Sequence, residues 1–131
     1  MFFAKTLDSR DDVLLESVKC FLPTRIFDIH AHLHDARYFS PDAWQTLTDV
    51  SPLGCEQHRA SIQRILRPNV LPANISGLYF PLPHASADRP GVNAWIAGEV
   101  KSHGGSACRS LILAAPGDGA EALARRMRRR E

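Results

Sequence analysis

The sequence predicts an α/β domain in which parallel strands alternate with helices. Three segments of strand length, the first alternating between polar and apolar residues and the other two apolar, are separated by stretches with a helical apolar period. This order is typical of βα units in a parallel sheet. A length of 131 residues and a hydrophobic content of 44% suffice for one buried core. We predict a single domain over residues 1–131, with a helix and lead-in over 1–24 and the strands with their connections over 25–131.

The first predicted element is a helix. Ser9 is a suitable cap, and Asp11 and Asp12 suit the positive N-terminal end of a helix. Pro23 ends the helix. Its predicted apolar stripe consists of Val13, Leu14, Val18 and Phe21.

Residues 25–33 are predicted to form the first strand, because polar and apolar side chains alternate there with a period of two. The polar positions, which we expect on one face, are Asp28, His30, His32 and His34. The apolar positions, which we expect to pack on the other face, are Phe27, Ile29, Ala31 and Leu33. The strand therefore presents a row of groups that could hold a metal.

The remaining elements follow from the same periods. After the first strand we predict a short helix over about 40–48, capped by Ser40 with Pro41 in its first turn, and a helix over 56–67 with Ile62, Ile65 and Leu66 inward. A buried strand over 75–82 and a helix over 92–100, closed by Gly104 and Gly105, come next. The last elements are a buried strand over 109–115 and a helix capped by Asp118, with Ala120, Leu123, Ala124 and Met127 inward. Trp44 and Trp95 are expected in the core.

Charge and cysteine content narrow the function classes. The net charge is +2, but residues 1–124 carry 11 basic and 13 acidic side chains, because five arginines lie in the last seven residues. The body offers no clustered basic surface, so we expect no nucleic-acid partner. No segment has the roughly 20 apolar residues that span a bilayer, and the first residues lack a basic leader. Three widely spaced cysteines argue against a disulfide framework, which favours a cytoplasmic protein.

The histidine strand carries the clearest chemistry. Its sequence is Phe27-Asp28-Ile29-His30-Ala31-His32-Leu33, and this His-x-His pattern at the end of a first strand resembles the amidohydrolase superfamily, in particular its branch of metal-dependent hydrolases and non-oxidative decarboxylases. The segments GLYFPLPH, NAWIAGEV and LILAAPGD resemble the second strand, second helix and third strand of that branch.

The resemblance implies a fold, a site and a reaction. The fold is a (β/α)8 barrel of the TIM type, and His30 and His32 become ligands of a divalent metal, zinc first, with manganese, iron or nickel as alternatives. The reaction is attack of metal-activated water on an amide, ester or lactone carbonyl of a small-molecule substrate. Decarboxylation or isomerisation on the same scaffold is the nearest variant.

Three further residues are candidates for the same site. Asp28 could orient an imidazole, and His34 could contact metal or substrate. His84 follows the second strand, at the side where a barrel builds its active site. His58 and His103 are expected to be structural or solvated, and no catalytic acid or base can be assigned.

The resemblance covers only part of a barrel. Such a barrel takes about 250 residues, so the chain is expected to be an N-terminal, truncated portion that holds the first three strands. In the superfamily, further ligands come from a lysine or glutamate on the fourth strand, histidines on the fifth and sixth, and an aspartate on the eighth. The alternatives are a noncatalytic metal-binding or assembly module, completed by another copy or a second chain, and a small α/β binding protein whose His-x-His pattern is incidental.

Overall fold

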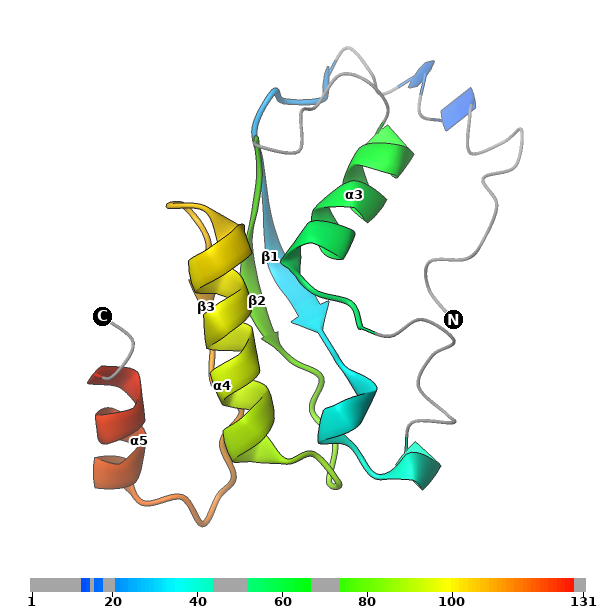
Figure 1. The fold of residues 1–131 in the computed structure, drawn as a ribbon. Coiled ribbons are helices and arrows are strands. Elements are labelled where there is room, and N and C mark those ends of the chain that lie inside the picture. Colours follow the sequence, from blue (N-terminus) through cyan, green and yellow to red (C-terminus); the bar gives the residue numbers. More distant parts are fainter. Residues whose placement is uncertain (1–12, 15, 18–20, 44–51, 67–73, 129–131) are drawn as a thin grey trace.

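A parallel sheet of three strands in the order β1-β2-β3 lies at the centre of the structure, a computed structural model that describes residues 13–14, 16–17, 21–43, 52–66 and 74–128 (Figure 1). The strands are β1 (Ile26–Leu33), β2 (Ile75–Pro81) and β3 (Arg109–Ser110). The helices are η2 (Ala36–Tyr38), α3 (Cys55–Leu66), α4 (Arg89–Glu99), the π-helical turn η4 (Val100–Gly104) and α5 (Ala120–Arg128). The predicted α/β class with parallel strands is confirmed.

Helices α3 and α4 lie side by side on one face of the sheet (Figure 1). The core fills the space between them and the strands, and its buried members are Ala31, Leu33, Cys55, Tyr79, Val92, Ile96 and Cys108. Trp95 packs against this core, as predicted, while Trp44 lies outside the described residues. Every second residue of β2 is buried, which is the pattern of a strand covered on one face.

Strand β1 contains a bulge that changes which side chains share a face. Asp28 pairs with Gly77 and Ala31 with Tyr79, so two residues of β1, Ile29 and His30, face one residue of β2. The alternation is therefore reset within the strand. Asp28 falls on the helix-covered face together with Ala31, while His32 pairs with Phe80 on the opposite face.

The bulge overturns part of the predicted pattern. Asp28 was expected to share a face with His30 and His32, and the register places it on the other one. Phe27 and Ile29 were expected to pack against helices, but 48% and 74% of their surfaces are exposed. The prediction for Ala31 and Leu33 is confirmed, since both are buried. The pattern failed because a period of two assumes regular pairing along the whole strand.

The connection after β1 follows the predictions where the structure describes it. The short helix begins at Pro41, and the Ser40 hydroxyl accepts a hydrogen bond from the Ala43 N–H at 3.4 Å. Its predicted end near Thr48 lies outside the described residues. Helix α3 matches the predicted 56–67 closely, but its buried side chains are Cys55 and His58, whereas Ile62, Ile65 and Leu66 are half-buried.

The third strand is much shorter than the predicted 109–115. Only Arg109 and Ser110 pair with β2, although the Leu111 N–H still donates to the Tyr79 carbonyl at 2.8 Å. Further on, the buried Asn93 amide of α4 binds both backbone groups of Leu113, accepting at 2.7 Å and donating at 2.9 Å. A side chain thus takes the place of a neighbouring strand.

The outer helices pack less than predicted. Val13, Leu14 and Phe21 are exposed, so the described part of the first apolar stripe does not enter the core, and Val18 lies outside the described residues. In α5, Leu123 and Ala124 are half-buried, whereas Ala120 and Met127 are exposed. No helix in the described ranges is long and apolar enough to cross a membrane.

Cys55 is expected to resist alkylation in the folded protein. Its side chain is fully buried at the start of α3, and burial, reinforced by the charge of Glu99, raises the pKa of its thiol from 9.0 to about 12. Since the thiolate is the nucleophile, we expect iodoacetamide at pH 8 to modify Cys55 at least about 100-fold more slowly than in the urea-unfolded chain, measured by mass spectrometry of peptides.

The same raised pKa predicts a pH dependence of stability. Because the folded state holds this proton more tightly than the unfolded state, its stabilising contribution is complete below pH 9 and is lost as the pH rises towards about 12. In the alkylation experiment on Cys55, equal rates of modification in the folded and the urea-unfolded protein would contradict the burial of this thiol.

Candidate metal centre

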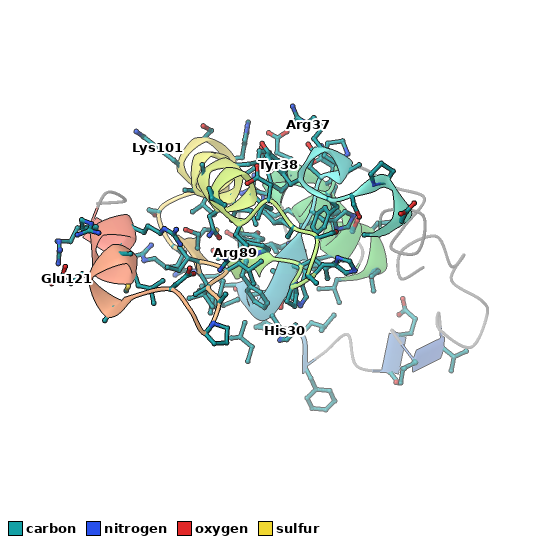
Figure 2. The ribbon with its side chains drawn as sticks, turned by 90° about the horizontal axis from the view of Figure 1, so that it is seen from below. His30, Arg37, Tyr38, Arg89, Lys101 and Glu121 are labelled. Atoms are coloured by element: carbon teal, nitrogen blue, oxygen red, sulfur yellow. The ribbon has the colours of Figure 1, made fainter. Side chains whose placement is uncertain are left out.

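His30 and His32 come together on the face of the sheet that the helices leave open. Figure 2 shows His30 on the side of the sheet opposite to α4. The Nε2 atoms of the two imidazoles lie 3.2 Å apart. Two nitrogen ligands at zinc distances and a tetrahedral angle would be about 3.3 Å apart. The 3.2 Å distance is that of an N–H···N hydrogen bond between the two rings, and it also fits two ligands of one shared metal ion.

The ring of His32 is oriented by the end of the neighbouring strand. Its Nδ1 atom lies 3.3 Å from the carbonyl oxygen of Pro81, the last residue of β2. A carbonyl only accepts, so Nδ1 carries the hydrogen and the lone pair of Nε2 is available. This contact to a carbonyl is the outer hydrogen bond that metal-binding histidines commonly make.

Burial also favours the metal-binding form of His32. Burial lowers its pKa, the nearby His30 and His34 lower it further, and the hydrogen bond to Pro81 acts in the opposite direction. The lowered pKa favours the neutral imidazole, which is the form that binds metals.

An aromatic ring forms the wall of the candidate centre. The ring of Phe80 lies edge to face with both imidazoles, with centroid distances of 5.1 Å to His30 and 4.3 Å to His32. Phe80 occupies this place because it is the register partner of His32. An apolar neighbour limits the access of water to a metal and lowers the local dielectric constant.

Asp28 makes its contacts beneath the strand, on the helix side. Its Oδ2 atom accepts a hydrogen bond from Nε2 of His58 at 2.9 Å, and its Oδ1 atom accepts one from the backbone N–H of His30 at 2.9 Å. The hydroxyl of Tyr79 lies 3.3 Å from Nδ1 of His58. Asp28 therefore touches the candidate centre through the backbone of His30.

The sequence interpretation did not connect His58 with this region. His58 was expected to be structural or solvated in a polar helix, and it is only 5% exposed, between α3 and the sheet, which agrees with the structural alternative. A signal was present in the sequence, because His58 follows Cys55 by three positions and precedes Ile62 by four. That spacing puts all three on one face of a helix.

The other predicted site residues make different contacts. His34 is 7% exposed, and its backbone forms an antiparallel bridge with Leu53. His84 is exposed at the end of β2, with Nδ1 2.8 Å from the hydroxyl oxygen of Ser86. His103 pairs with Glu56 at 3.2 Å. Within the portion of the chain that the structure describes, no three histidine, cysteine, aspartate or glutamate side chains form a group that could hold a metal ion.

Comparisons of the chain with protein-family models, with curated proteins and with solved structures find no match. The argument for a candidate metal centre therefore rests on the positions of His30 and His32 alone.

Proposed function

We propose that His30 and His32 bind one divalent metal ion and form part of the metal site of a metal-dependent hydrolase of the amidohydrolase type. Zinc is the first candidate for the ion, and manganese, iron or nickel are the alternatives. The 3.2 Å separation of the two Nε2 atoms carries the proposal. The predicted substrates are small molecules with an amide, ester or lactone carbonyl.

The position of the pair in the fold supports a barrel-type site. In a (β/α)8 barrel the helices lie outside, the opposite face of the strands lines the interior, and active groups collect at the carboxyl ends of the strands. His30 and His32 lie in the second half of β1, on the face away from the helices, and His32 contacts the last residue of β2. The imidazole rings of His30 and His32 would therefore point into the interior of such a barrel.

Each residue of the candidate metal centre has a defined role in this proposal. His30 and His32 hold the ion, the Pro81 carbonyl fixes the ring of His32, and Phe80 forms an apolar wall beside both rings. A divalent ion bound there would lower the pKa of a water molecule and polarise a carbonyl. Two imidazoles fill half of a tetrahedral coordination sphere, so water or side chains outside the described residues would fill the rest.

Zinc titration followed by nitrogen NMR of the imidazoles tests the proposal at single residues. On addition of zinc we expect the Nε2 resonances of His30 and His32 to shift together and to saturate at one ion per chain. The exposed His84 and His103 serve as internal controls, and their resonances should stay in place. Equal shifts at all exposed histidines, or no shift at His30 and His32, would overturn the metal assignment.

A further inference from the structure

We propose that Asp28, His58 and Tyr79 form a hydrogen-bonded chain that positions His30 for metal binding. The three residues come from β1, α3 and β2, and the chain ends at the backbone N–H of His30. This inference rests on the proposed metal-binding role of His30 and His32. His58 and Asp28 are positioning residues in it, because they act through the His30 backbone.

The donors and acceptors of the chain align in one direction. A carboxylate only accepts, so His58 Nε2 carries a hydrogen and donates to Asp28 Oδ2. In the neutral imidazole the Nδ1 lone pair of His58 accepts from the Tyr79 hydroxyl, which keeps its proton because burial raises its pKa. Asp28 Oδ1 remains available for the His30 N–H. Each group of the chain thus has a matching partner.

The contact with His30 occurs inside the bulge of β1. A bulge leaves one residue outside the regular ladder, so its backbone needs another partner to hold one conformation. Asp28 Oδ1 provides that partner for the backbone N–H of His30. The hydrogen bond from His58 to Asp28 Oδ2 restricts rotation of the carboxylate. The orientation of His30 towards His32 is therefore fixed from the opposite face of the sheet.

The local packing is arranged around this chain. The ring of Tyr79 lies over Gly77, where a Cβ atom would come within 3.0 Å of the tyrosine Cζ. Gly77 is also the register partner of Asp28. His58 and Tyr79 are buried, and buried polar side chains often stabilise a fold no more than apolar side chains of the same volume, which favours a role in positioning.

The test compares variants of His58 with a matched core variant. His58→Phe fills the site but removes both hydrogen bonds, and His58→Gln keeps an amide that can donate to Asp28. Val92→Ala truncates a fully buried side chain of the same core on α4, away from these hydrogen bonds. Cobalt affinity and the visible spectrum of bound cobalt are measured together with the thermal midpoint of each protein.

We expect His58→Phe to weaken cobalt binding about 10-fold and to change the cobalt spectrum, as the loss of outer hydrogen bonds does at metal sites. His58→Gln should restore most of the affinity. Val92→Ala should lower the thermal midpoint and leave the affinity unchanged. If His58→Phe binds cobalt as tightly as Val92→Ala, the positioning role is wrong.

A second readout separates this inference from the metal assignment. In metal-free protein, the His30 amide should exchange with deuterium more slowly than in Asp28→Ala or His58→Phe, because its hydrogen bond is lost or loosened there. If wild type binds no cobalt at His30 and His32 but the amide is protected in this way, the metal assignment fails and the positioning of the His30 backbone stands. Unchanged exchange in both variants would overturn the chain itself.

Discussion

Replacing either His30 or His32 with alanine is expected to lower zinc affinity more than about 100-fold, since loss of an outer hydrogen bond alone costs roughly 10–100-fold. The remaining imidazole would bind the ion through one nitrogen, and the 3.2 Å pair would no longer exist. His30 is exposed, so His30→Ala should change the thermal midpoint little. Isothermal titration of metal-free protein with zinc measures the effect.

The matched control for this prediction is His84→Ala. His84 is also exposed and follows the next strand, but its described partner is Ser86. Its replacement should leave zinc affinity within about twofold of wild type. An equal loss of affinity in His84→Ala and His30→Ala would show that zinc binds to surface histidines in general.

Replacing Tyr79 with alanine is expected to destabilise the fold by about 3–5 kcal/mol, the range for truncating a large buried aromatic side chain. Tyr79 has 0% of its surface exposed and lies in the core between the sheet and the helices. Since small domains are stable by only about 5–15 kcal/mol, much of that stability would be lost. Urea unfolding followed by circular dichroism measures the change.

Tyr79→Phe separates the ring from the hydroxyl. It keeps the packing over Gly77 but removes the donor to His58 Nδ1, so we expect a cost of about 1–3 kcal/mol, the usual range for leaving a buried polar group unpaired. If the alanine and phenylalanine variants unfold at the same urea concentration, the ring contributes little and the core described here is wrong.

The fold class and most element positions could be predicted from the sequence. The helical period of the residues in α3 and α4 and the apolar run in β2 are strong sequence signals, because each of these elements has one face covered by the core. The third strand could not be bounded in this way. Its apolar residues continue to 115, but the length of the ladder depends on the Asn93 side chain of another element.

The candidate site could be predicted only in part. The His-x-His spacing places His30 and His32 together on any extended backbone, and the structure brings their rings together. The position of Asp28 could not be predicted, because the bulge depends on pairing with β2. The Pro81 contact was also beyond the sequence, since a backbone carbonyl has no residue type that would reveal it.

The bulge has a further consequence for association between molecules. Strand β1 lies at one edge of the described sheet, where unpaired backbone groups can recruit a strand from another chain. Its backbone changes register in the middle, and the His30 N–H is already bound by Asp28 of the same chain. An incoming straight strand could match only half of β1 at a time. The bulge at Ile29 and His30 therefore restricts which strands can pair along that edge, and a strand that closes the proposed barrel there would need a complementary irregularity.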